Sequence, residues 1–431
     1  MFSTRELLRI GYRWLLALAA CVAVGLALMV AVASLPQQQI KNNLVSSAQY
    51  ERTSGECTHV TFLQKLHYTE AIMTMLACTM DEDKPFSSAL ESNTHTMTFF
   101  LEDPVRDFKH FMLNGVEQMK KADYNRYWHG YLVSLRPLLY FFDLPTIRHY
   151  SLYAFSILAT IVLLMIQRRF GTSIALLFLI ALLHAGWFYA LPYSLDQNKV
   201  YYIIFISSII LLASDTLYQS REWLPVFFLC IGACTSFLDF LTAPVLTLAT
   251  PLLLVFLKRG TTPIMQQFLT IILCSSAWCL GYAGMWAAKW VLCALFTNCE
   301  VFDIVKGSLK ERSIGVVEFD FAKFCRRMLY PIPDHGYTWW VGVSTALVLA
   351  LGGHLAFLFL RYRQAALNNI GYFVVMLYPV IWFFATRQHT LIHLVFTYRI
   401  MEGVILGYGI FAIKIYRDAR ETKLKKLASM R

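Results

Sequence analysis

Ionisable residues of this chain gather at a few places beside long apolar runs. Asp239 lies in Thr235-Ser-Phe-Leu-Asp-Phe-Leu-Thr242, between two such runs. A carboxylate at an apolar boundary is costly unless it faces a wet cavity or a partner, so it predicts function. Asp239 would then be a general base that accepts a proton from a hydroxyl. The structural alternative is an Asp that caps the following helix together with Thr242.

Glu70 is a second candidate base, in Leu66-His-Tyr-Thr-Glu70-Ala-Ile-Met73. Leu66, Ile72, Met73 and Leu76 fall near helical spacing, which predicts an amphipathic helix from Phe62 to Ala77. A carboxylate beside apolar surface can act as a proton acceptor. The preference of helix starts for acidic residues offers a structural explanation instead.

Basic residues cluster in Arg387-Gln-His389-Thr-Leu-Ile-His393 and continue to Arg399. His389 and His393 are four residues apart and share a helix face, a spacing that can ligate Zn²⁺. No carboxylate follows in a metalloprotease pattern, so we predict no metal site and leave a divalent cation open as a cofactor. Arg399 suits a phosphate because its planar fork matches phosphate oxygens. The alternative is a structural ion pair of Arg399 with Glu402 or Asp239.

Three further cations punctuate an aromatic stretch that begins at Asn125. Arg126, His129 and Arg136 stand among Tyr, Trp and Leu residues. The functional interpretation is a binding surface for a lipid phosphate or a sugar ring. The alternative is an aromatic belt whose cations extend to the head groups.

The composition predicts an integral membrane protein. Of 431 residues, 57% are hydrophobic and 15% charged, whereas soluble domains carry about 25% charge. Apolar runs of roughly 20 residues recur, each long enough to cross a bilayer as a helix. The first run exceeds the h-region of a secretory signal, so we expect a retained span. We predict an all-α bundle of about ten spans, at 14–35, 149–167, 173–192, 199–216, 223–239, 242–257, 267–296, 339–360, 369–386 and 395–415.

The charge pattern predicts the orientation of these spans. Lys and Arg concentrate in alternate short connections and in the C-terminal tail, whereas the opposite short connections carry only Lys199 and Arg387. This bias places both termini in the cytoplasm. The net charge of +11 fits this rule and attraction to anionic lipids. We expect no nucleic-acid partner, because no soluble basic domain is visible.

Two long connections, 36–148 and 297–338, would then lie outside the cell in a single membrane-embedded domain spanning 1–431. Long loops are usually functional. In the first, Tyr127 to Phe142 predicts a helix lying in the membrane interface. The two loops hold Cys57, Cys78, Cys299 and Cys325. Four external Cys permit two disulfides, of which 57–78 and 299–325 close the shortest loops, although three connectivities are possible.

A family resemblance appears at these motifs. Arg126-Tyr-Trp-His-Gly-Tyr131, Thr235 to Thr242 and Phe396-Thr-Tyr-Arg399 are similar to blocks of a poorly characterised group of bacterial multi-pass proteins. The layout resembles the GT-C class of membrane glycosyltransferases. That resemblance implies a polyprenyl-phosphate sugar donor, a catalytic acid in the first external loop with juxtamembrane helices after it, and basic residues that bind the lipid phosphate. One departure is that no acid occurs between Pro36 and Tyr50.

We therefore expect an inverting glycosyltransferase in the cytoplasmic membrane of a bacterium. Glu70 or Asp239 would be the base, and Arg126, His129, Arg136, His389, His393 and Arg399 would bind the lipid phosphate or substrate. The acceptor would be a cell-envelope glycan or glycolipid. A polymerase or ligase using polyprenyl-diphosphate glycans, with Arg326 and Arg327 at the donor, remains an alternative. A transporter or flippase is another, although no internal repeat is visible.

Overall fold

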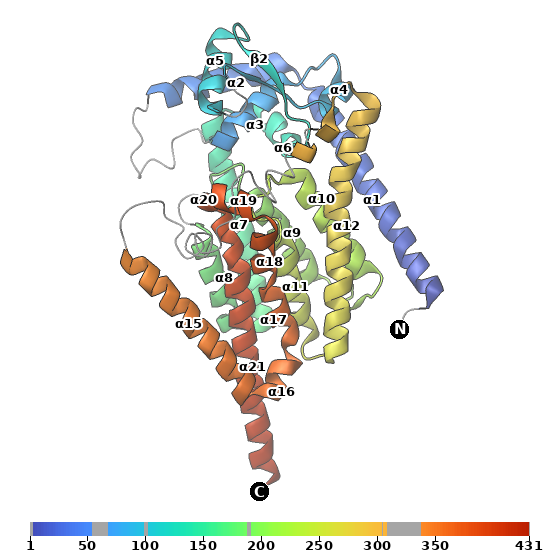
Figure 1. The fold of residues 1–431 in the computed structure, drawn as a ribbon, viewed down its shortest axis with the longest axis vertical. Helices are drawn as coiled ribbons and strands as arrows, with labels where there is room; N and C mark the ends of the chain where they lie inside the picture. The colour runs from blue at the N-terminus through green and yellow to red at the C-terminus, as the bar shows by residue number, and fades with distance from the viewer. Residues whose placement is uncertain are drawn as a thin grey trace.

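The chain is mostly helical, in agreement with the all-α fold class (Figure 1). The computed structural model describes residues 3–53, 68–98, 102–187, 191–303, 305–307 and 338–430. Its longer helices are α1 (Thr4–Ala33), α2 (Gln37–Thr53), α3 (Tyr68–Thr79), α5 (Pro104–Asn114), α6 (Leu132–Phe141), α7 (Leu144–Phe170), α8 (Thr172–His184), α9 (Lys199–Ala213), α10 (Trp223–Leu238), α11 (Leu246–Arg259), α12 (Ile264–Phe296), α15 (Thr338–Arg361) and α21 (Glu402–Ser429).

Short elements connect these helices. They are α4 (Pro85–Leu90), η1 (Leu217–Gln219), α16 (Arg363–Asn368), α17 (Ile370–Met376), α18 (Tyr378–Ala385), α19 (Arg387–Ile392), α20 (Leu394–Thr397), η2 (Tyr398–Met401) and the strands β1 (Asn93–Thr96) and β2 (Lys120–Asp123). The two strands pair antiparallel, with Asn93 opposite Asp123 and Thr96 opposite Lys120. The sequence reasoning did not predict this sheet.

Among the described residues, three helices are long and apolar enough to cross a membrane: α1, α7 and α12. Shorter apolar helices accompany them, among them α8, α9, α10 and the C-terminal part of α15. Long apolar helices fit a membrane protein.

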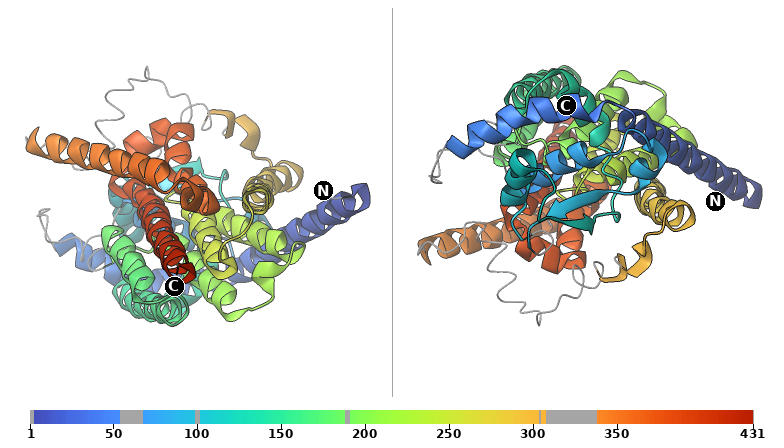
Figure 2. Two further views of the ribbon diagram at one scale, coloured as in Figure 1. Left: turned by 90° about the horizontal axis from the view of Figure 1, so that it is seen from below. Right: turned by 90° about the horizontal axis from the view of Figure 1, so that it is seen from above.

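The helices form an elongated bundle that carries a separate layer at one end (Figure 1). We call this layer, built from α2 to α6 with β1 and β2, the cap. Both termini lie away from the cap (Figure 1). Seen along the bundle, α1 and α15 extend outward on opposite sides (Figure 2). The described parts of the predicted 36–148 loop that precede α7 therefore form a folded layer, and the chain returns from it into the bundle through α7.

Several predicted boundaries shift for local reasons. The expected span 369–386 is divided into α17 and α18 around Leu377, where Pro379 lacks the N–H needed to continue a helix. The expected span 395–415 begins as a regular helix only at Glu402. In the cap, α3 begins at Tyr68, while 54–67 lie outside the described residues. The predicted helix Tyr127 to Phe142 begins only at Leu132.

Helices α10 and α12 make a close backbone crossing at two glycines. A Cβ added at Gly232 would lie 2.1 Å from the carbonyl oxygen of Trp278, and one at Gly281 would lie 2.1 Å from that of Leu229. Small residues allow helix backbones to approach this closely. This crossing fixes α10, whose last turn precedes Asp239.

We expect Gly232→Ala to lower the free energy of unfolding by about 1–3 kcal/mol, because the added methyl group must push the two helices apart. The measurement is thermal unfolding of the purified protein in detergent. The matched control is Gly353→Ala in α15, where an added Cβ meets nothing within 4 Å. Equal stability of the two variants would contradict the close crossing.

Candidate functional site

The segment from Arg126 to Tyr131 fixes the cap to the end of α10. It lies outside regular helix, and His129 has a positive φ of 54°. The Gly130 N–H donates to the carbonyl of Phe237 at 2.8 Å. A Cβ at Gly130 would lie 2.5 Å from that oxygen and 2.3 Å from the Phe237 ring. Only glycine permits this contact, which brings the segment from Arg126 to Tyr131 against the segment from Thr235 to Thr242.

Aromatic rings fill the junction between the cap and the helices. Phe240 follows Asp239, and the rings of Tyr127, His129 and Tyr131 lie 5.9, 5.8 and 4.9 Å from it between centroids. Trp286 of α12 lies 5.9 Å from Tyr127. We call these five residues the aromatic cluster. Ring pairs at these separations add stabilisation beyond the burial of area.

Asp239 stands beside the aromatic cluster in the connection between α10 and α11. It is 5% exposed, and its carboxylate accepts hydrogen bonds from the Thr242 N–H at 3.0 Å and the Thr242 hydroxyl at 2.5 Å. It forms no ion pair with any described residue. Burial raises the pKa of Asp239 to about 7, against the hydrogen bonds from Thr242, which lower it. Asp239 is thus a buried acid that can exchange a proton near neutral pH.

The basic segment that begins at Arg387 contacts the connection between α10 and α11 through the carbonyl of Leu241. His389 Nε2 donates to the carbonyl oxygen of Leu241 at 3.0 Å, and Leu241 has a positive φ of 65°. The rings of His389 and His393 lie 4.6 Å apart, and His393 stacks on Phe396 at 5.1 Å. Helix α19 ends at Ile392, yet the two imidazoles remain adjacent. His389 therefore contacts the connection that contains Asp239, and His393 lies next to His389.

Arg399 is buried and bound to neutral groups. Its Nε donates to the Ala185 carbonyl at 2.8 Å, and its Nη1 donates to the Gln197 side chain. The expected structural pairs are not formed, because among the described residues no carboxylate lies within ion-pair distance of Arg399. Glu402 instead accepts a hydrogen bond from the Tyr201 hydroxyl at 2.7 Å.

Glu70 is held by a buried ion pair. Its carboxylate accepts from Arg148 Nη2 at 2.5 Å and from the Leu195 N–H at 2.8 Å. The two side chains are 1% and 8% exposed. The segment that contains Leu195 and Gln197 thus contacts both Glu70 and Arg399. Because Arg148 neutralises the carboxylate and two donors occupy its oxygens, Glu70 has the environment of a structural anchor.

Two of the predicted phosphate ligands have interior structural roles. Arg136 donates from Nε to the Val32 carbonyl at 2.8 Å and from Nη2 to the Leu35 carbonyl at 2.8 Å, with a further bond to Ala77. It thereby binds carbonyls at the C-terminal ends of α1 and α3. Burial lowers its pKa to about 10, so it stays charged at neutral pH. Its position binds the cap to α1 and offers nothing to a substrate phosphate.

His129 is also committed to the interior. Its Nε2–H donates to the Tyr124 carbonyl at 2.8 Å, and its Nδ1 accepts from the Tyr131 hydroxyl at 3.2 Å. Burial lowers the pKa of His129 to about 3, so the ring is neutral at pH 7 and brings no positive charge to a phosphate. Arg126 differs, because its guanidinium lies over the rings of Tyr124 and Tyr127 at 4.8 and 5.4 Å. This is a cation–π arrangement.

Sequence reasoning missed two buried cations. Arg148 pairs with Glu70, and Lys289 of α12 donates to the Leu90 carbonyl at 2.7 Å while lying 5.4 Å from the Trp128 ring. Lys289 is 0% exposed. An ionisable residue inside an apolar run was the available signal, since such residues need a specific partner. Arg148, at the outer edge of an expected span, gave a weaker signal.

Only one cysteine of each predicted disulfide, 57–78 and 299–325, lies among the described residues. Cys78 is a buried free thiol and Cys299 is a free thiol, whereas Cys57 and Cys325 lie outside the described residues. Burial raises the pKa of Cys78 to about 12, so this thiol is unreactive. Within the described part of the chain, no three His, Cys, Asp or Glu residues gather as a metal site.

A comparison with protein-family models, curated protein sequences and solved structures finds no match to this chain. Function must therefore be argued from the residues of the site.

The Glu70 environment predicts a structural effect on mutation. We expect Glu70→Gln to lower the free energy of unfolding by about 3–5 kcal/mol, because Arg148 loses its carboxylate in a buried place. The double variant Glu70→Met with Arg148→Met should recover most of that loss. Thermal unfolding in detergent measures both.

The matched control is the exposed pair of Asp215 with Arg169, whose acid is 73% exposed. Asp215→Asn should change stability far less than Glu70→Gln, since exposed pairs contribute little. A Glu70→Gln protein that is as stable as the parent would contradict the anchor role and favour the catalytic one.

Proposed function

We propose that this chain is a membrane glycosyltransferase that moves a sugar from a polyprenyl-phosphate donor to a cell-envelope acceptor outside the cytoplasm. In this proposal about ten helices span the membrane, both termini are cytoplasmic, and the cap faces outward. The single observation that carries the proposal is Asp239: a buried carboxylate without a described ion-pair partner, where the cap meets the helix ends. Such an acid suits a proton acceptor.

The proposed orientation is supported by the ends of the bundle. Arg169, Arg221 and Arg259 lie at the helix ends opposite the Asp239 connection. Basic residues mark the cytoplasmic side of membrane proteins. The cap and Asp239 then belong to the outer side, where lipid-linked sugars meet their acceptors.

The proposed reaction uses Asp239 as general base. Asp239 takes the proton of an acceptor hydroxyl while that oxygen attacks the anomeric carbon of the donor sugar. The bond between this carbon and the phosphate oxygen breaks with inversion, and its electron pair leaves with the polyprenyl phosphate. Positioned cations stabilise such a developing charge most strongly where water is excluded.

Other described groups fit the remaining needs of the reaction. In the aromatic cluster, Phe240 and Trp286 are the partly exposed members, and their rings suit stacking on the apolar face of a sugar; Tyr127, His129 and Tyr131 are buried behind them. Arg126, whose guanidinium lies over the Tyr127 ring, and His393, whose ring lies beside His389, are candidates for the phosphate. Arg399, bound to Ala185 and Gln197, is a further candidate. Glu70, Arg136 and His129, which bind interior groups, are removed from the proposed site. The polymerase or ligase alternative depended on Arg326 and Arg327, which lie outside the described residues.

We expect Asp239→Asn to reduce sugar transfer by about 10²–10⁴-fold, the usual contribution of a general base. The assay uses the purified protein, a polyprenyl-phosphate sugar and a membrane-extract acceptor. Glu117→Gln, on an exposed acid of the cap, is the matched control and should keep full activity. Undiminished transfer by Asp239→Asn would remove Asp239 from the catalytic role.

The pH dependence follows from the raised pKa. The base must be ionised, so transfer should rise with pH through about 7 in the parent protein. The free energy of unfolding should change in the opposite direction, because the folded protein favours the protonated form of Asp239. This contribution is fully present below the pKa that Asp239 has in the unfolded chain, and it is lost as the pH rises through about 7.

Asp239→Asn should lack this fall, because its amide does not ionise. Unfolding temperatures of both proteins between pH 4 and 8 test the raised pKa without any substrate. Parallel profiles for the two proteins would show that the carboxylate is already ionised at low pH.

A further inference from the structure

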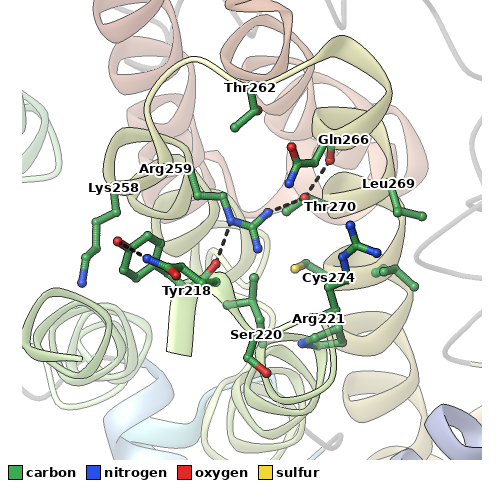
Figure 3. A pocket seen from close by; sticks show the side chains of 14 residues that line it. Tyr218, Ser220, Arg221, Lys258, Arg259, Thr262, Gln266, Leu269, Thr270 and Cys274 are labelled. Atoms are coloured by element: carbon green, nitrogen blue, oxygen red, sulfur yellow. Dashed lines mark hydrogen bonds between the residues drawn. The ribbon is translucent and has the colours of Figure 1, made fainter. Parts of the chain in front are cut away.

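A cavity of about 340 Å³ opens between the start of α10, the end of α11 and the start of α12 (Figure 3). Helix α10 begins at the cavity with Trp223 and ends at Leu238 beside Asp239, so the two places lie at opposite ends of one helix. The lining residues come from η1 and the connection after it, the start of α10, the end of α11 and the start of α12.

The lining carries positive charge without negative charge. It contains Arg221, Lys258 and Arg259, and none of its residues is acidic. Lys258 is already engaged, because its ammonium lies 3.5 Å from the Asp215 carboxylate and donates to backbone carbonyls. Two guanidinium groups therefore remain to be accounted for.

Neither guanidinium forms a salt bridge with a described carboxylate, and the Glu6 carboxylate interacts with Arg221 only at longer range. Arg259 donates from Nε to the Tyr218 carbonyl at 2.7 Å and from Nη1 to the Thr270 hydroxyl at 2.6 Å, both neutral acceptors (Figure 3). Arg221 makes no hydrogen bond or ion pair with a described residue. The neighbouring Glu222 is bound by Arg13 instead.

Backbone dipoles add to this field. The N-terminal ends of α10 and α12, helices of 16 and 33 residues, both border the cavity. The N-terminal end of a helix favours an anion. The lining also contains the apolar residues Leu224 of α10 and Leu269 and Leu273 of α12. The cavity thus combines an anion-attracting side with an apolar side.

We propose that this cavity binds a phosphate group, carried either by a small phosphate ester or by an anionic lipid head group. Arg221 supplies the guanidinium that turns to the phosphate, and Arg259 supplies a second, already oriented by Tyr218 and Thr270. The positive-inside rule accounts for the number of cations here. That rule does not explain why Arg221 and Arg259 border a cavity whose lining contains no acidic residue. The proposal concerns the face opposite Asp239 and is independent of the glycosyltransferase proposal.

Binding is measured on the purified full-length protein in a neutral detergent, from the shift of its unfolding temperature. One arm titrates inorganic phosphate. The other titrates dioctanoyl phosphatidic acid, with dioctanoyl phosphatidylcholine as the uncharged comparison. Saturable binding of phosphate assigns the site to free phosphate esters, and binding of phosphatidic acid alone assigns it to a lipid head group. Either result supports the proposal if it depends on Arg221.

The variants decide that dependence. Arg221→Gln should weaken binding about tenfold or more, since charge-assisted bidentate bonds are the strong ones. Arg221→Lys, which keeps the charge without the planar fork, should be intermediate. The matched control is Arg168→Gln, which removes an exposed cation at the same end of the bundle, outside the cavity lining, and should bind like the parent. Equal affinity of Arg221→Gln and the parent, or the absence of saturable binding to the parent, overturns the proposal.

Discussion

The contact of Gly130 with the last turn of α10 is the constraint on which the site depends. The two backbones lie so close that no side chain fits between them. This contact also sets the positions of three rings. Because the short segment is anchored at Gly130, it places Tyr127, His129 and Tyr131 around Phe240. Asp239 lies between Phe237 and that ring contact. The position of the carboxylate is therefore set jointly by the cap and by α10.

Buried cations hold the cap on the bundle. Arg136 binds carbonyls at the ends of α1 and α3, and Lys289 binds those at the end of α4. The last carbonyls of a helix lack partners within it and carry the negative end of its dipole. A cation placed there satisfies them. Each such group is costly to bury and costly to detach, so the cap is tied to the helices at fixed points.

The two ends of the bundle have opposite character. At the cap end, Asp239 follows the C-terminal end of α10, where the helix dipole disfavours a negative charge. At the other end, the N-terminal ends of α10 and α12 meet Arg221 and Arg259. A buried acid and a cavity lined by cations are thus separated by the length of a helix. Chemistry at one end and phosphate recognition at the other would use different groups throughout.

Residue types and spacing were sufficient to predict the helical class, the long apolar helices and the candidates Asp239 and Arg399, because hydropathy and an ionisable residue at an apolar boundary are local signals. Which candidates remain available to a substrate was decided only by tertiary contacts. Glu70 and Asp239 are both acids beside apolar sequence, yet Glu70 pairs with Arg148 from another helix, whereas Asp239 accepts hydrogen bonds from the nearby residues Phe240, Leu241 and Thr242. Arg136 likewise binds carbonyls of the distant residues Val32 and Leu35, whereas Arg126 lies over the rings of its sequence neighbours Tyr124 and Tyr127. The partner of a buried charge comes from distant sequence, so its environment, and with it its chemistry, is fixed only when the chain has folded.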